Sequence, residues 1–267
     1  MPIENVSESG DAVLAESDVR AIVRLLAEVA AADCSHAAMK QLLMDGLAKL
    51  IDADAWIWML GCEVQPGEQP IYLSMAHGGF SEERYGQLLQ AAAHPDMAWL
   101  SETMIRDMLT KGAHVTRRRE QLATEDIFTR TGVSDRLRAA NIGPLILALR
   151  PIGERSVSTM GIYRRMDQPA FTDRETKIAH VVLSEVPWLH EEGWPKDRGD
   201  TVPFLPPRLR LVLNLLLDGR SRKEIASALE LSENTVAGYQ RDVYGHFGVG
   251  TQVALMRRFQ LGDGGDR

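Results

Sequence analysis

The side chains best suited to specific chemistry lie near the C-terminus, between Arg222 and Arg241. An arginine guanidinium can donate two parallel hydrogen bonds to guanine, and an asparagine amide can pair in a similar way with adenine. Asn234 and Arg241 are separated by about two turns of an α-helix, so both can lie on one helix face. We therefore expect these two residues to read base edges in the major groove of double-stranded DNA.

A second group of residues in the same stretch is suited to phosphate. Thr235 and the backbone amides at a helix start can hold a phosphate group, and Arg222, Lys223 and Tyr239 are candidates for phosphate contacts. Gly238 allows a close approach to DNA, although glycine costs a helix about 1 kcal/mol relative to alanine. The alternative for each residue is an ordinary solvated helix face.

Four short helices within residues 205–262 are expected to position these side chains. Pro206 and Pro207 are expected to start the first helix and Gly219 to end it, and Ser221 with Glu224 starts the second. Ser232 is expected to cap the third helix, Gly248 to end it, and Thr251 to precede the fourth. The residues expected to face inward are Leu209, Val212, Leu213, Leu216, Ile225, Ala226, Leu229, Val236, Val243, Phe247, Val253, Leu255, Met256 and Phe259. A short helix, a tight turn and a longer helix are typical of a helix-turn-helix unit.

The stretch from Leu205 to Phe259 resembles the DNA-binding domain of the LuxR/GerE family. The matching residues are Leu213, Leu216, Gly219, Ser221, Lys223, Glu224, Ile225, Ala226, Leu229, Leu231, Ser232, Thr235, Val236, Gly248, Val249 and Leu255. The resemblance implies that the third helix enters the major groove and that the fourth helps two subunits to pair. The chain departs from the family pattern at Pro206, Leu209, Ala237, Tyr239 and His246. The third helix therefore keeps only Arg241 as a full positive charge.

The preceding part of the chain alternates between helical and strand patterns. Helices are expected from Ser17 to Ala31, from Ser35 to about residue 50, around 81–93 and 97–111, and over 172–190, where Thr172 and Glu175 form a capping box. Strands are expected over 55–60, 71–76, 143–152 and 156–166, the last two joined by a turn at Gly153 and Glu154. The stretch 112–142 gives no clear assignment. This order of elements indicates an α+β domain.

Two short motifs within that domain resemble the end of a GAF domain, a ligand-sensing module. They are the run from Gly161 to Arg165 and the run from Pro169 to Glu175, followed by a long helix. We therefore expect a GAF-like sensor domain, an antiparallel sheet with flanking helices, over 18–190. It follows a disordered segment (1–17) and precedes a linker (191–204) and an all-α, four-helix LuxR-type domain (205–262).

Bulk properties agree with a soluble protein of two domains. The chain has 267 residues and a net charge of −7, but its last 67 residues carry 9 Lys and Arg against 7 Asp and Glu. The acidic excess therefore lies in the N-terminal part, and DNA binding is permitted. Two cysteines provide no disulfide framework. Because no signal peptide and no long apolar run is found, we expect a cytoplasmic protein with no membrane association.

Other candidate sites are weaker. Trp56 and Trp58 share one face of a strand and could line a ligand pocket, although core packing is the stronger alternative. The run from Arg117 to Arg119 is interpreted as solvated surface, with phosphate or DNA contact as the alternative. No metal-ligand spacing, nucleotide loop or catalytic constellation is present, so we expect no metal, no cofactor and no enzyme activity.

These patterns favour a homodimeric, one-component bacterial transcription regulator that binds DNA under the control of a small-molecule ligand. Three alternatives stay open. The C-terminal stretch also resembles region four of sigma factors, which would make RNA polymerase a partner. A sensor or interaction protein with a degenerate DNA-binding domain would explain the weakly basic third helix. An enzyme is the third alternative.

Overall fold

The structure, a computed structural model, describes residues 12–62, 64–68, 71–153, 156–191, 207–229 and 231–260. The elements before the sheet's last hairpin are α1 (Glu16–Ala31), α2 (His36–Leu50), β1 (Ala55–Cys62), β2 (Ile71–Gly78), α3 (Glu82–Ala92), α4 (Pro95–Lys111), β3 (Val115–Arg118), η1 (Arg119–Gln121), α5 (Glu125–Phe128) and α6 (Gly132–Ala139). Then follow β4 (Leu145–Gly153), β5 (Ser156–Tyr163), α7 (Asp173–Ser184), α8 (Pro187–Glu191), α9 (Pro207–Leu217), α10 (Arg222–Ala228), α11 (Glu233–Phe247) and α12 (Gln252–Gln260). Most of the expected disordered segment, nearly all of the expected linker, and Glu154 lie outside the described residues.

The five strands form one antiparallel sheet with the order β2-β1-β5-β4-β3. The expected hairpin is confirmed, because β4 pairs with β5 through partners such as Ala148 and Met160. The edge strand β3 comes from the stretch that the sequence left unassigned. The fold is therefore α+β, as expected, with an all-helical C-terminal part.

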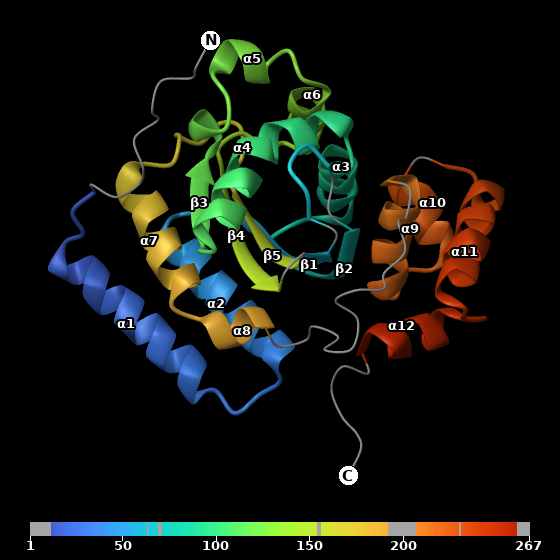
Figure 1. Ribbon diagram of the computed structural model, residues 1–267, viewed down its shortest axis with the longest axis horizontal. Helices are drawn as coiled ribbons and strands as arrows, with labels where there is room; N and C mark the ends of the chain where they lie inside the picture. Colours follow the sequence, from blue (N-terminus) through green and yellow to red (C-terminus); the bar gives the residue numbers. More distant parts are fainter. Residues whose placement is uncertain are drawn as a thin grey trace.

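Alternation along the strands separates two layers of helices. Trp56, Trp58 and Met160 point from the sheet into a core shared with α1, α2, α7 and α8. Met59 and Tyr163 point to the opposite face, toward α3, α4 and α6. Figure 1 shows α1, α2 and α7 on one side of the sheet and α9 to α12 grouped beyond β2 and α3. No helix in the described ranges has both the length and the apolar character that a membrane crossing requires.

Most expected helix caps are confirmed by hydrogen bonds. The Ser35 hydroxyl accepts from the backbone amide of Ala38, and Thr172 and Glu175 form the capping box of α7. The expected cap at Ser17 is wrong: α1 begins at Glu16, and the Asp18 carboxylate accepts from the amide of Ala15 at 3.1 Å. An acidic side chain at the third helical position can satisfy the amide of the residue that precedes the helix in this way.

The helix expected over 172–190 is in fact two helices. α7 ends at Ser184 and α8 begins at Pro187. Proline lacks an amide hydrogen and disfavours helical geometry in the residue before it, so it fits the start of a new helix better than the interior of one.

The caps and stops of the C-terminal helices follow the sequence expectations, but Val253, which was expected to face inward, is 61% exposed. Ser221 with Glu224 forms a capping box, and Ser232 caps α11. Gly219 and Gly248 have positive φ angles at the ends of α9 and α11, where glycine carries no steric penalty. The buried apolar residues here are Val212, Leu213, Leu215, Leu216, Ile225, Ala226, Val236, Val243, Phe247 and Leu255.

Candidate DNA-binding and ligand-binding sites

Helix α11 packs against its neighbours by one face and leaves the other face exposed. Val236, Val243 and Phe247 are buried against the neighbouring helices. Asn234 and Arg241 lie on the exposed face of α11. Because α9 and α10 lie between α11 and the sheet, this face points away from the N-terminal part (Figure 1). The structure therefore brings together the two residues expected to read bases.

The residues expected to contact phosphate have more varied surroundings. Lys223 is exposed at the start of α10. Arg222 donates from Nε to Oε1 of Gln240 at 3.0 Å, which ties α10 to α11. Tyr239 is half-buried against the apolar core. The amide of Thr235 is already used by the Ser232 cap, at 3.1 Å. Lys223, Arg222 and Thr235 are thus exposed, whereas Tyr239 is half-buried.

The local field around α11 is weak. The exposed acids Glu233 and Asp242 are direct sequence neighbours of Asn234 and Arg241. A Cβ atom built on Gly238 would meet no atom within 4 Å, so this position is open space. Base reading here would depend on hydrogen-bond geometry more than on a strong positive potential.

An apolar cavity lies between the sheet and the helices that cover it. Its floor includes Met59, Leu149 and Thr159 from three adjacent strands, and its cover includes Leu88 of α3 and Met104 of α4. The strand residues are on the face opposite to the two tryptophans, because side chains alternate along a strand. Such an enclosed apolar space is the usual character of a small-molecule site.

Two polar atoms in residues that line this cavity have no hydrogen-bond partner in the described chain. They are Oγ1 of Thr159, in the middle of β5, and Nη1 of Arg119, and both are buried. A buried polar atom without a partner carries a desolvation cost of about 1–3 kcal/mol. A ligand with hydrogen-bond acceptors would remove part of that cost.

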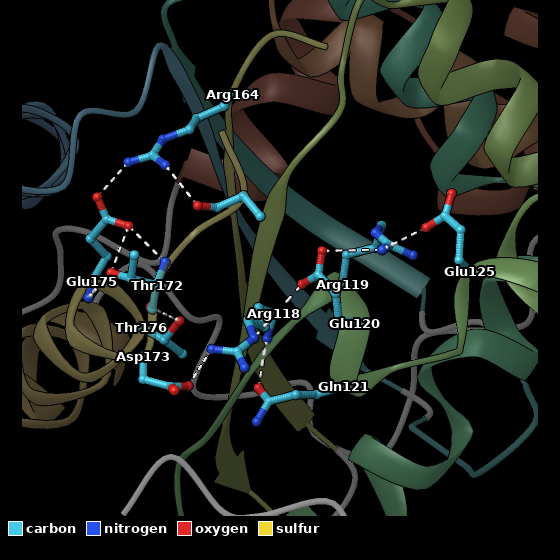
Figure 2. A network of polar contacts seen from close by, with 11 residues as sticks. Arg118, Arg119, Glu120, Gln121, Glu125, Arg164, Thr172, Asp173, Glu175 and Thr176 are labelled. Carbon is cyan, nitrogen blue, oxygen red and sulfur yellow. Dashed lines mark hydrogen bonds and ion pairs between the residues drawn. The ribbon is translucent and has the colours of Figure 1, made fainter. Parts of the chain in front are cut away.

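Arg119 belongs to a polar network that fixes the segment after β3 (Figure 2). Its Nη2 atom pairs with Glu125 at 2.7 Å and with Glu120 at 3.1 Å, and its guanidinium lies 5.0 Å from the ring centre of Phe128. Glu120 and Glu125 together carry more negative charge than the single Arg119 guanidinium balances. Nη1 of Arg119 therefore favours a neutral hydrogen-bond acceptor over an anion.

The arginine run is therefore less solvated than expected. Arg117 pairs with Asp107 at 3.1 Å, and Arg118 forms an ion pair with Asp173 at the start of α7 (Figure 2). Each of these guanidinium groups is mostly covered. The sequence interpretation as a solvated surface is wrong, because Asp107, Asp173 and Glu125, which pair with the arginines, lie on other elements.

Trp56 and Trp58 lie in the core and do not line this cavity. The Trp56 indole donates to Oδ1 of Asp45 at 2.8 Å, and the Trp58 indole donates to Oγ of Ser158 at 2.7 Å. Both rings are nearly inaccessible and face α2. Their location is that of core packing.

Sequence reasoning missed a polar cluster between the two parts of the chain. The Tyr85 hydroxyl donates to Oδ2 of Asp218 at 3.1 Å, and its ring stacks on His77 with centroids 3.8 Å apart. Burial raises the pKa of Asp218 to about 6 and lowers the pKa of His77. No local pattern could reveal this cluster, because Tyr85 and Asp218 are 133 residues apart.

Comparison with known proteins agrees with the C-terminal geometry. Residues 204–259 match the family described as bacterial regulatory proteins, luxR family, also called GerE. This part of the chain is a LuxR-family domain. No curated protein matches the chain.

Two solved structures show a weak similarity over most of the chain. A crystal structure of Escherichia coli SdiA is 15% identical with a TM-score of 0.40, and the match covers 91% of this chain and 97% of that one. A structure of SdiA in complex with octanoyl-rac-glycerol is 14% identical with a TM-score of 0.41, and covers 96% and 100%.

Proposed function

We propose that this protein is a one-component transcription regulator that binds a specific sequence in double-stranded DNA through α11. The carrying observation is the exposed face of α11, with Asn234 and Arg241 together, within a domain that matches the LuxR family. Lys223 and Thr235 hold phosphate, and Gly238 allows the helix to approach the groove. In this assignment the protein is a regulator and not an enzyme, and it acts in the cytoplasm.

The protein acts as a homodimer in this proposal. α12 exposes Val253, which has 61% of its surface accessible, while Leu255 of the same helix is buried. A second copy that covers this side of α12 would place two recognition helices on a two-fold DNA site, with half-sites about one helical turn apart.

The N-terminal part, over 18–190, acts as a GAF-like sensor joined by a linker (191–204) to the DNA-binding domain (205–262). Support for a signal comes from the apolar cavity, which carries unpartnered polar atoms on Thr159 and Arg119. The signal is a small molecule with an apolar body and at least one hydrogen-bond acceptor.

A second candidate function follows from the acids on α11. Glu233 and Asp242 oppose the approach of DNA phosphates, which favours a sensor or interaction protein that has lost DNA affinity. A protein partner such as RNA polymerase would then be the target, and a polymerase pull-down would identify it.

The test is a binding titration of the purified protein against a pooled random-sequence DNA library at low salt. We expect enrichment of a two-fold motif for the natural chain, and relaxed preference at one base position for Arg241→Ala. Arg20→Ala, on the exposed surface of α1, is the matched control and should enrich the same motif as the natural chain. A folded, dimeric protein that enriches no motif would overturn the proposal in favour of the degenerate domain.

A further inference from the structure

Helix α3 contacts both the apolar cavity and the DNA-binding domain. Leu88 and Ala92, one turn apart, line the apolar cavity. Tyr85 and Gly86, within one turn before Leu88 on the same helix, contact the DNA-binding domain. The same short, regular element therefore touches both the cavity and the helix-turn-helix unit.

The contact with the DNA-binding domain is unusually close at one point. A Cβ atom built on Gly86 would lie 2.8 Å from the backbone carbonyl oxygen of Ala228, at the end of α10. That distance is shorter than real Cβ atoms tolerate, and the opposing atom is backbone, which has no rotamer to change. Only glycine allows α3 and α10 to approach to this distance.

Polar contacts flank this close approach. The Tyr85 hydroxyl bonds to Asp218, directly after α9, and Glu82 pairs with Arg220 at 2.5 Å. β2 also packs on α9, and apolar residues from both parts form one continuous cluster. The two parts are thus docked through a specific joint, which consists of Glu82, Tyr85 and Gly86 on one side and Asp218, Arg220 and Ala228 on the other.

We propose that α3 transmits the state of the cavity to the helix-turn-helix unit through this joint. A group that fills the cavity displaces α3 at Leu88 and Ala92, and because the helix moves as a rigid unit, Tyr85 and Gly86 are displaced with it. The inference rests on the proposed function in one respect, namely that the signal molecule binds in the cavity.

The joint sets the position of the DNA-binding domain without covering its reading face. Asn234 and Arg241 remain exposed while α9 and α10 are docked. Reading a two-fold site depends on the spacing and angle of two recognition helices. A change in how the DNA-binding domain docks therefore alters DNA binding by changing the position of α11. It does so without covering or uncovering the exposed face of that helix.

The test is a double-mutant cycle in the full chain, read by hydrogen–deuterium exchange of residues 207–229 without DNA or ligand. Ser101→Leu serves as the probe of cavity filling. Ser101 lines the cavity from α4, and its hydroxyl donates to the carbonyls of Met97 and Ala98 in the same helix. Gly86→Ala separates α3 from α10. Gly245→Ala is the matched control, since a Cβ atom there meets nothing within 4 Å.

We expect Ser101→Leu to change exchange in residues 207–229 by about fivefold, a typical coupling between sites. In the Gly86→Ala background the effect of Ser101→Leu should disappear, whereas it should persist with Gly245→Ala. If Ser101→Leu fails to fold, Ser101→Val provides a smaller filling group for the same cycle. An effect of equal size with and without the Gly86→Ala substitution, or no effect in the natural chain, would overturn the proposal.

The outcome is separable from that of the DNA titration. Exchange of residues 207–229 is measured without DNA, so the cycle can succeed in a protein that binds none. That result would support the coupling through the joint and contradict the proposed DNA binding. The reverse pattern, with a DNA motif but no coupling, removes the role of α3 alone.

Discussion

The hydroxyl of Tyr85 donates a hydrogen bond to Oδ2 of Asp218 at 3.1 Å and so links α3 to the residue that follows α9. Burial raises the pKa of Asp218 from 3.8 to about 6, while the hydrogen bond from Tyr85 opposes that rise. Ionisation of the Asp218 carboxyl group therefore lowers the stability of the folded state, and the hydrogen bond from Tyr85 reduces that loss of stability.

The first prediction concerns the pH dependence of stability. Because the folded pKa of Asp218 lies above its unfolded value, the folded state binds the proton more tightly. The contribution of Asp218 to the free energy of unfolding should therefore fall as pH rises from about 4 to about 6, and stay low above that. Urea titrations across this range should show the fall, and Asp218→Asn should reduce it. An unchanged pH profile in Asp218→Asn would contradict the assignment.

The second prediction concerns Tyr85→Phe. Loss of a hydrogen bond to a buried carboxylate should lower the free energy of unfolding by about 1.5–3 kcal/mol at pH ~7.5. The loss should be smaller at pH ~5, where Asp218 is largely neutral. Chemical denaturation at the two pH values measures the difference, and an equal loss at both would show that the carboxylate charge plays no part.

The third prediction concerns the cavity. Thr159→Val removes a buried hydroxyl that has no partner among the residues the structure describes, so the free energy of unfolding should rise by about 1 kcal/mol. Thr176→Val is the matched control: the Thr176 hydroxyl is buried but donates to the carbonyl of Thr172 at 2.8 Å, and its loss should be destabilising. Thermal unfolding of both variants without ligand provides the comparison. Destabilisation by Thr159→Val would indicate a hydrogen-bond partner for the hydroxyl.

The fourth prediction concerns the buried arginine in the motif that follows β5. Arg164 is 2% exposed; it donates to the carbonyls of Ile51 and Asp52 and pairs with Glu175 at 2.6 Å (Figure 2 draws the pair). Lysine lacks the planar, multiply donating head group, so Arg164→Lys should cost about 3 kcal/mol.

The neighbouring residue provides the control for that variant. Arg165 is half-exposed and contacts the Asp54 carboxylate at 3.4 Å. Arg165→Lys should change the free energy of unfolding by less than about 1 kcal/mol. Equal effects of the two substitutions in urea would refute the structural role of Arg164.

The fifth prediction separates phosphate contact from base reading. Lys223→Ala should weaken DNA binding similarly for all sequences, and should reduce the slope of log K against log salt by about 0.9. Asn234→Ala should instead relax the preference at one base position. Titrations with a preferred and a scrambled site at several salt concentrations distinguish the two effects. A sequence-dependent loss in Lys223→Ala would reverse the assignment.

The sequence determined the local features of the fold. The caps at Ser232 and Thr172 and the glycine stop at Gly248 depend on residues within one or two helical turns, and each was confirmed. The exposed positions of Asn234 and Arg241 follow from the buried spacing of Val236, Val243 and Phe247, which is equally local. The error at Ser17 arose because α1 begins before it, at Glu16, where the Asp18 carboxylate accepts from the amide of Ala15.

Tertiary structure decided which residues act together across long sequence separations. The face of the sheet that holds the cavity, the ion pair between Arg118 and Asp173, and the joint between Tyr85 and Asp218 all join residues from distant elements. Periodicity along a chain shows that a side chain is buried or exposed, and it contains no information about the partner on the other element. Partners become definite only when packing fixes the distance between elements, and that is why the exposed face of α11 was predictable and the joint behind it was not.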